Sequence, residues 1–233
     1  MIYIVMPAYN PQREELVNYI KELYIKVSLK SFLLILIDDG SSNDYKETFD
    51  YLKKSYPIII LRHSKNLGKG AALKTGFRYI QSQSNSVNNT IVTVDSDGQH
   101  LVSDLLKIIN KSTTDRFILG SRNFLKTKKV PLRSRVGNVI TSLIFKLRTG
   151  VYLSDTQTGL RAFHSELLTD FLEIRQNGYD YEAAMLIKVI KSKIKITEIA
   201  ISTVYIQNNN SSHFNPFKDS LKIYATIFKI YKN

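Results

Sequence analysis

Short apolar runs alternate with helical patterns along the first half of the chain. Five runs rich in Val, Ile and Leu predict strands, at residues 2–6, 32–37, 58–61, 90–94 and 117–120. Between them, apolar residues recur at helical spacing at residues 11–27, 43–54, 70–80 and 101–110. Near-continuous apolar strands joined by helices are typical of a parallel sheet that is covered on both faces. The sequence therefore predicts an α/β fold with a mostly parallel central sheet flanked by helices.

The second half of the chain is less regular. An apolar stripe at residues 136–147 and a further pattern at 181–190 predict helices, and residues 194–199 and 202–206 predict two short strands. A strongly amphipathic helix is expected at 217–231, with lysines at the border of its apolar face. Such a helix packs on the core of its own protein or lies on an anionic membrane, and the pattern leaves both interpretations open.

The charge of the chain is high and unevenly placed. The net charge is +13, and residues 121–149 contribute eight cations and no acidic residue. Such a segment is typical of a protein with an anionic partner, which could be nucleic acid, an anionic membrane or a phosphorylated substrate. No recognition-helix, RNP-type or zinc-finger signature is found, so we expect no nucleic-acid partner. The absence of cysteine excludes disulfides and thiolate metal sites, and we expect neither a signal peptide nor a membrane-spanning helix.

Polar clusters follow the five predicted strands. They are Pro7-Ala8-Tyr9-Asn10, Asp38-Asp39-Gly40-Ser41, Asn66-Leu67-Gly68-Lys69-Gly70, Asp95-Ser96-Asp97 with Gln99, and Gly120-Ser121-Arg122. Each cluster alone could be a turn. Because parallel strands end at the same edge of a sheet, we expect all five to line one crevice.

The chemistry of these clusters suits a phosphorylated ligand. Asp95 and Asp97 are two residues apart, so on extended backbone they point to one side, where carboxylate oxygens favour Mg²⁺ or Mn²⁺. The alternative is a turn that caps the next helix. Lys69, in a glycine-flanked loop before a helix, suits a pyrophosphate, and Asp39 could accept hydrogen bonds from a base or ribose. Neither a P-loop nor a dinucleotide-binding motif is found.

These motifs, in this order, resemble those of family 2 glycosyltransferases of GT-A fold, over residues 2 to about 217. Within that family the chain looks like the dolichyl- and undecaprenyl-phosphate sugar transferases, the group that includes dolichol-phosphate mannose synthases. The resemblance implies a GT-A domain at residues 1–214. It leaves residues 215–233 as an amphipathic helix that contacts a membrane surface or a partner protein.

The resemblance also implies roles for individual residues. Nucleotide-sugar binding is expected from Pro7, Tyr9, Asn10, Asp38, Asp39, Lys69, Asp95, Ser96, Arg161 and Glu182. The metal, Mg²⁺ or Mn²⁺, is expected on Asp95, Asp97 and Gln99. The acceptor phosphate is expected on Arg122, Arg133 and Arg135, of which only one of the last two need point inward. The expected catalytic set is Asp97, Asp155, Arg122 and Arg133.

Some of these assignments have simpler alternatives. Asp155 could simply form a structural ion pair with Arg161 across a turn, and Glu182 could lie on a surface helix. Relatives often carry an arginine and a lysine for the diphosphate after the last strand, where this chain has Gln207 and His213. At these two positions the chain departs from the family's pattern.

The expected activity is metal-dependent, inverting transfer of one sugar from a nucleoside-diphosphate sugar to a polyprenyl phosphate such as undecaprenyl phosphate. A phosphate acceptor is largely ionised at neutral pH and needs no general base. The resemblance further implies cell-surface glycan or cell wall polysaccharide assembly. It implies a peripheral, cytoplasmic location on the inner face of the cell membrane, on an anionic surface and with a small membrane protein as an optional partner. The alternatives are transfer to a sugar hydroxyl, with Asp155 or Glu182 as the base, and, remotely, a non-enzymatic nucleic-acid-binding protein.

Overall fold

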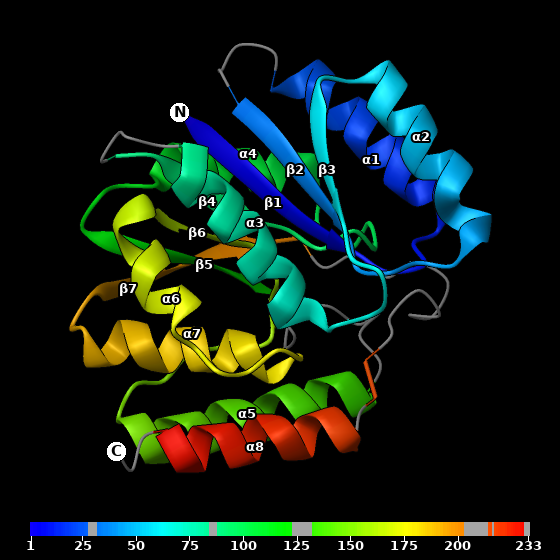
Figure 1. The fold of residues 1–233 in the computed structure, drawn as a ribbon. Helices are drawn as coiled ribbons and strands as arrows, with labels where there is room; N and C mark the ends of the chain where they lie inside the picture. The colour runs from blue at the N-terminus through cyan, green and yellow to red at the C-terminus, as the bar shows by residue number, and fades with distance from the viewer. Residues whose placement is uncertain (28–31, 84–87, 123–131, 203–213, 216, 231–233) are drawn as a thin grey trace.

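The structure is a computed structural model that describes residues 1–27, 32–83, 88–122, 132–202, 214–215 and 217–230. The side chains of residues 132–135 and 230 lie outside this description. Within the described residues the strands are β1 (Ile2–Ala8), β2 (Phe32–Asp38), β3 (Ile58–Arg62), β4 (Thr90–Thr93), β5 (Arg116–Arg122), β6 (Arg161–His164) and β7 (Lys195–Ile201). They form a seven-stranded sheet in the order β3-β2-β1-β4-β6-β5-β7 (Figure 1).

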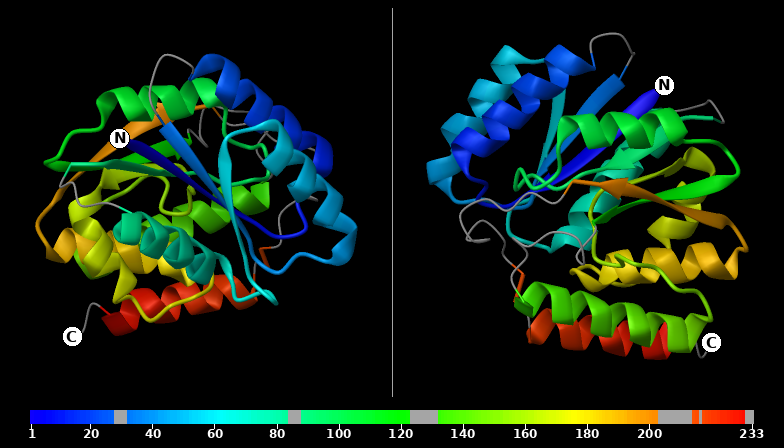
Figure 2. Two further views of the ribbon diagram at one scale, coloured as in Figure 1. Left: turned by 45° about the horizontal axis from the view of Figure 1, so that its top comes forward. Right: turned by 180° about the vertical axis from the view of Figure 1, so that it is seen from behind.

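Helices cover both faces of this sheet (Figures 1 and 2). The α-helices are α1 (Arg13–Lys26), α2 (Lys46–Ser55), α3 (Lys69–Gln83), α4 (Val102–Lys111), α5 (Leu132–Thr149), α6 (Leu168–Leu172), α7 (Asp180–Lys191) and α8 (Lys218–Ile230). Short 3-10 turns, η1 (Asn43–Tyr45) and η2 (Ser165–Leu167), precede α2 and α6. The prediction of an α/β fold with a mostly parallel sheet is confirmed.

Alternation along the strands creates two separate cores. In β1, Tyr3 and Val5 face the core formed with α3, α6 and α7, while Ile4 and Met6 face the core formed with α1, α2 and α4. This period of two is a property of extended backbone. Because both faces are covered, the central strands are buried along nearly their whole length.

The direction of the strands brings the predicted polar clusters together. β1 pairs in parallel with β2 and β4, β2 pairs in parallel with β3, and β5 pairs in parallel with β7. Among the strands that the structure describes, β6 alone is antiparallel, and it separates β4 from β5. β4 and β5 are each antiparallel to β6 and therefore run the same way. The carboxyl ends of β1, β2, β3, β4 and β5 thus lie at one edge of the sheet.

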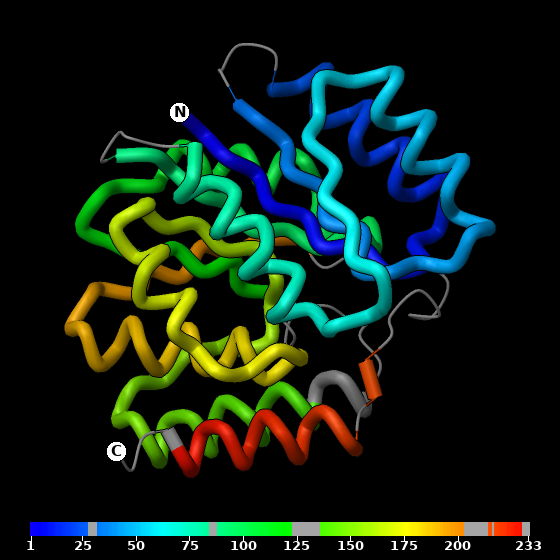
Figure 3. The backbone as a smooth tube through the Cα atoms, viewed as in Figure 1, coloured from blue at the N-terminus to red at the C-terminus, as the bar shows by residue number. Residues whose placement is uncertain are grey.

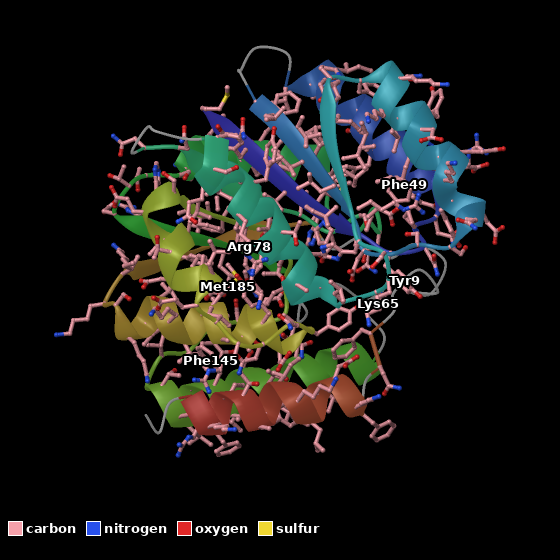
Figure 4. All side chains as sticks on the ribbon, viewed as in Figure 1. Tyr9, Phe49, Lys65, Arg78, Phe145 and Met185 are labelled. Atoms are coloured by element: carbon pink, nitrogen blue, oxygen red, sulfur yellow. The ribbon has the colours of Figure 1, made fainter. Side chains whose placement is uncertain are left out.

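An additional helical layer lies beyond α7. Helices α5 and α8 run side by side there (Figures 1 and 3, and the right-hand view of Figure 2). Ile223 and Ile227 of α8 and Phe145 of α5 join the core on the α7 side of the sheet. In Figure 4, Phe145 lies between this layer and α7. Within the described residues, no helix is both long enough and apolar enough to span a membrane.

The sequence analysis differs from the structure at three places. It did not predict β6 or α6, because Arg161-Ala162-Phe163-His164 is too short and too polar to show a strand pattern. Of the predicted strand 194–199, residues 195–199 belong to the longer strand β7, and most of the second predicted strand, 203–206, lies outside the described residues. The apolar stripe at 136–147 does form a helix, but much of the stripe is exposed rather than buried.

Candidate active site

A cavity of about 1370 Å³ opens at the carboxyl edge of the sheet. Loops after β1, β2, β4 and β5 line one part of it, and α5 and α8 line another. In Figure 4, Tyr9 and Lys65 lie at this edge. The cavity brings together ten of the predicted site residues: Pro7, Tyr9, Asp39, Lys69, Asp95, Ser96, Asp97, Gln99, Arg122 and Glu182. Residues from six separate segments of the chain therefore meet at one site.

Asn10 and Asp38 hold the loops of the site together. The Asn10 side-chain oxygen accepts a hydrogen bond from the Ser42 backbone N–H (3.0 Å), and the Asn10 backbone N–H donates to the Ser41 hydroxyl (2.9 Å). Asp38 is fully buried, accepts from the Ser41 N–H (2.9 Å) and pairs with Arg62 (2.8 Å). Both residues lie behind the lining of the cavity. Asn10 ties the loop after β1 to the loop after β2, and Asp38 ties the loop after β2 to the end of β3.

Asp39 positions the glycine-rich loop before α3. Its two carboxylate oxygens accept hydrogen bonds from the backbone N–H groups of Leu67 and Gly68, both at 2.9 Å. His63 contacts the same carboxylate at 2.7 Å. Gly68 has φ of +98°, and a Cβ there would lie 2.5 Å from the backbone oxygen of Asn177. Only glycine fits this backbone without strain, so Asp39 and Gly68 together set the position of Lys69.

Lys69 lies between two carboxylates. Its ammonium group is 2.7 Å from Asp95 and 2.8 Å from Glu182. Burial alone would lower the pKa of Lys69, but Asp95 and Glu182 outweigh this effect and raise the pKa. Burial would likewise raise the pKa of Asp95, but Lys69 and His100 hold the pKa of that carboxyl well below its usual range. Lys69 and Asp95 are therefore both charged at neutral pH.

Asp97 differs from its neighbour. Burial and the charge on Asp95 raise the pKa of Asp97 above its usual value. Its carboxylate accepts a hydrogen bond from the Gln99 backbone N–H at 3.0 Å. Ionising Asp97 beside Asp95 is therefore unfavourable. A cation beside Asp97 would offset this unfavourable free energy, because an opposite charge favours the ionised form.

The residues present fit a hard divalent cation in part. Asp95 and Asp97 supply carboxylate oxygens from one loop and both line the cavity, which is the donor chemistry of Mg²⁺ and Mn²⁺. Among the residues that the structure describes, no group of three or more His, Asp or Glu side chains converges as a complete metal site. Such ions are commonly held by one or two carboxylates, with substrate phosphates completing the coordination.

Arg122 forms a bidentate pair with Asp155. The Nε and Nη2 groups of Arg122 donate to the two carboxylate oxygens of Asp155 at 2.7 and 3.2 Å. Asp155 is fully buried, whereas Arg122 also lines the cavity. A carboxylate held in this way fixes the plane of the guanidinium. The Asp155–Arg161 pair that the sequence left open is not what forms, because Asp155 takes Arg122 instead.

Arg161 lies beneath the cavity. It is fully buried, and its guanidinium donates to the backbone oxygens of Thr158 (2.9 Å), Glu182 (2.7 Å) and Thr156 (3.3 Å). In the structure Arg161 therefore supports the 156–158 loop and the start of α7. The alternative that Glu182 is a surface residue is wrong, because only 4% of it is exposed.

Four residues of the prediction are less completely described. Arg133 and Arg135 lie in the first turn of α5, with their side chains outside the description, so their contact with an acceptor phosphate stays a prediction. Gln207 and His213 lie outside the described residues.

The sequence analysis missed three contributors to the site. Tyr179 lines the cavity, with its ring centre 5.8 Å from the Lys69 ammonium group. Gln157 also lines it, and its side-chain amide donates to the Thr141 hydroxyl at 3.2 Å. His63 positions Asp39. His63 directly follows a strand, which is the one signal that could have identified it.

The fold is the GT-A architecture of known glycosyltransferases. A mannosyl-3-phosphoglycerate synthase from Rubrobacter xylanophilus superimposes with a TM-score of 0.69 at 13% identity, over 98% of this chain and 71% of that one. A mannosyltransferase from Pyrobaculum calidifontis, solved with GDP-Man and Mn²⁺, gives a TM-score of 0.57 at 14% identity, over 99% and 70% of the two chains. At these identities the similarity concerns the fold.

The sequence model of glycosyl transferase family 2 matches residues 3–168, and the chain belongs to this family. It is 31% identical over 226 residues to a UDP-N-acetylglucosamine–dolichyl-phosphate N-acetylglucosaminyltransferase from Methanococcus voltae, covering 89% of this chain and 87% of that protein. It is 27% identical over 233 residues to a dolichyl-phosphate β-glucosyltransferase from Saccharomyces cerevisiae, covering 85% and 65%. The resemblance to the polyprenyl-phosphate sugar transferases is therefore confirmed.

Proposed function

We propose that this enzyme transfers one sugar from a nucleoside-diphosphate sugar to a polyprenyl phosphate, undecaprenyl phosphate being the acceptor of choice for a test. The observation that carries the proposal is the composition of the cavity. Its sheet side is lined by charged groups that include Lys69, Asp95 and Arg122, and its helical side by Ile140, Phe145 and apolar residues of α8. A ligand with a phosphate head and a hydrocarbon tail matches both sides. The names of the relatives from Methanococcus voltae and Saccharomyces cerevisiae support the same acceptor class.

The donor would be bound by the loops after β1 and β2. Tyr9 and Asp39 line the cavity beside the glycine-rich loop, and Lys69 opens α3 at the same place. The helix N-terminus and the ammonium group both favour a diphosphate. Donor binding would then draw Lys69 toward the diphosphate in addition to the carboxylates it holds in the structure.

The proposal includes Mg²⁺ or Mn²⁺ as the cofactor. Asp95 and Asp97 would hold the ion, with Gln99 as a neighbour. Bound there, the ion would neutralise the charge that develops on the leaving diphosphate. The raised pKa of Asp97 supports this role. It means that ionising the Asp97 carboxyl is unfavourable in the ligand-free site, and a bound cation would offset that free energy.

The acceptor would be oriented rather than deprotonated. Arg122, fixed by Asp155, presents a planar donor group to the cavity that suits phosphate oxygens, and Arg133 or Arg135 would add a second cation. The acceptor phosphate is already ionised and attacks the anomeric carbon from the face opposite the diphosphate. Residues of this chain therefore contribute positioning and charge stabilisation.

Transfer to a sugar hydroxyl is less well supported. Such a reaction needs a general base that can take a proton. Asp155 is fully buried under Arg122, and Glu182 is paired with Lys69. Each carboxylate would have to give up its ionic partner before it could act as the base.

The test is incubation of the purified protein with labelled UDP-GlcNAc, UDP-glucose and GDP-mannose, each with undecaprenyl phosphate and Mn²⁺. We expect a labelled, lipid-extractable product with one donor and none with the Asp97→Asn variant. The absence of a lipid product with every donor, beside an active polyprenyl-phosphate transferase as a positive control, would overturn the proposal. Because the acceptor is a membrane lipid, the proposal also places the enzyme peripherally at the inner face of the cell membrane, alone or with a small membrane protein.

A further inference from the structure

The Asp155 carboxylate that holds Arg122 lies in a loop rather than in a helix or strand. Residues 150–160 connect α5 to β6 and form no regular element. Asp155 is nonetheless fully buried, and it accepts hydrogen bonds from the Arg122 backbone N–H (3.3 Å), Nε (2.7 Å) and Nη2 (3.2 Å). A carboxylate orients a guanidinium only as firmly as its own backbone is held. The direction of Arg122 therefore depends on the contacts that hold this loop.

Two side chains of α5 bind the loop on either side of Asp155. The Asn138 amide donates to the backbone oxygen of Ser154 at 2.7 Å, and the Thr141 hydroxyl accepts from the Gln157 side-chain amide at 3.2 Å. The Gln157 backbone N–H in turn donates to the Asp155 carboxylate at 3.2 Å. Asn138 and Thr141 are three residues apart and so share one face of the helix. We call Asn138, Thr141, Ser154 and Gln157 the α5 clamp.

The two clamp residues on α5 are buried although they are polar. Asn138 is 3% exposed and Thr141 is 1% exposed. Apolar side chains at these positions would fill the space without the unfavourable free energy of burying polar groups. What the polar groups add is direction, because a hydrogen bond weakens steeply when its angle changes, whereas apolar contacts are non-directional. The buried face of α5 therefore fixes the geometry of the loop in addition to covering the core.

Thr149 offers a matched comparison within the same helix. Thr141 and Thr149 each donate a hydroxyl hydrogen to the backbone oxygen one turn earlier in α5, at 2.8 Å. The Thr149 hydroxyl also contacts the backbone of Val151, directly after the helix, whereas the Thr141 hydroxyl contacts Gln157. The two threonines thus make the same local bond and differ in their link to the site.

We propose that Asn138 and Thr141 are positioning residues for Arg122. They act through the loop at 154–157, whose Asp155 carboxylate sets the plane of the Arg122 guanidinium. The first turn of α5 carries Arg133 and Arg135, so the clamp also sets how far the backbone of that turn lies from Arg122. Only the use of Arg122 on an acceptor phosphate rests on the proposed function, since the clamp itself belongs to the ligand-free protein.

The first test needs no substrate. The Arg122 Nε–H donates to a buried carboxylate, so its hydrogen exchange with water is slowed while the pair is closed. Heteronuclear NMR follows this exchange, with the signal assigned by its loss in Arg122→Lys. We expect roughly tenfold faster exchange in Thr141→Val, which loses one hydrogen bond to the loop. Thr141→Ser, which keeps the hydroxyl, should restore the slow rate, and Thr149→Val should not change it.

A second control concerns α8. The Thr141 hydroxyl also contacts the Tyr224 hydroxyl at 3.5 Å. Tyr224→Phe removes this contact and leaves Gln157 in place, so we expect the exchange of the Arg122 Nε–H to stay slow. Gln157→Met breaks the bond to Thr141 from its other, half-buried end. It should accelerate exchange as Thr141→Val does, and it serves in place of Thr141→Val should that variant not fold.

The kinetic test uses undecaprenyl phosphate as the acceptor. Thr141→Val should lower kcat/KM for the acceptor about tenfold, because a displaced orienting group slows transfer, and should leave the affinity for the donor unchanged in calorimetry. Thr149→Val should transfer like the wild type. Because Thr141 acts through Arg122, the double variant Thr141→Val/Arg122→Lys should be no slower than Arg122→Lys alone.

Three results would overturn the proposal. They are unchanged Arg122 Nε–H exchange in Thr141→Val, equal acceleration in Thr149→Val, and losses that multiply in the double variant. Failure of the proposed function would look different. A wild type that makes no lipid product would refute polyprenyl-phosphate transfer, while the exchange rates would still decide whether α5 positions Arg122.

Discussion

Lys69 provides the most direct test of the site's electrostatics. Its ammonium group is the cation between Asp95 and Glu182 in the structure. The Lys69→Met change keeps most of the side-chain volume and removes the charge. The carboxylates of Asp95 and Glu182 would then lie close together without the positive charge that lies between them in the wild type.

The magnitude follows from burial. The side chains of Lys69 and Glu182 are 12% and 6% exposed, and that of Asp95 is 23% exposed. Removing one partner of a buried ion pair costs about 3–5 kcal/mol, and the exposure of Asp95 places the expected cost near the lower end, at about 3 kcal/mol. For a chain of this size each kcal/mol lowers the unfolding temperature by about 2–4 °C. We therefore expect a decrease of roughly 6–12 °C.

The assay is thermal unfolding at pH 7.5, first in EDTA and then with increasing Mn²⁺. Because a bound cation would replace the lost ammonium charge, Mn²⁺ should raise the unfolding temperature of the variant more than that of the wild type. Lys65→Met is the control, since Lys65 is an exposed lysine in the same loop. An unchanged unfolding temperature of Lys69→Met in EDTA would refute the reasoning, and so would an equal decrease in Lys65→Met.

Three further predictions concern single contacts of the site. Asp97→Asn should stabilise the ligand-free protein at pH 7. Because the pKa of Asp97 is raised above its usual value of 3.8, the ionised carboxylate destabilises the folded protein at neutral pH, and asparagine carries no charge. Denaturant titrations should show this gain disappear as the pH falls below that value, and a loss of stability at pH 7 would contradict it. Arg122→Lys should lower kcat/KM roughly 10- to 100-fold, since one ammonium cannot reproduce the bidentate pair with Asp155. The affinity of the variant for the donor, measured by calorimetry, should be unchanged. A decrease in donor affinity that matches the decrease in kcat/KM would indicate that Arg122 contacts the donor instead. Gly68→Ala should destabilise the protein by about 1–3 kcal/mol, because φ is +98° and the Asn177 oxygen is 2.5 Å from the new Cβ; a variant with wild-type stability in urea would show that the loop can relax.

The sequence by itself determined the α/β class, the boundaries of most strands and helices, and the set of loops that meet at the site. These features depend on local patterns: strand residues alternate or run apolar, helix residues recur every three to four positions, and turn residues follow each strand. Parallel strands end at one edge, so Tyr9, Asp39 and Asp95 could be placed in one crevice without coordinates. The strand β6 was missed because its four residues, Arg161-Ala162-Phe163-His164, include two polar side chains and form no apolar run of the kind that revealed β4.

Only the tertiary structure decided which charged groups pair and which way α5 faces. Asp155 takes Arg122 rather than Arg161, and Lys69 lies between Asp95 and Glu182, because side chains 26 to 113 residues apart in sequence meet only after the sheet has formed. The apolar stripe of α5 is equally compatible with burial or exposure when read from the sequence. The opposite face of α5 is held against the rest of the protein by hydrogen bonds from the Asn138 amide to the Ser154 backbone oxygen and from the Gln157 amide to the Thr141 hydroxyl. Pairing and orientation depend on long-range geometry, which no local pattern records.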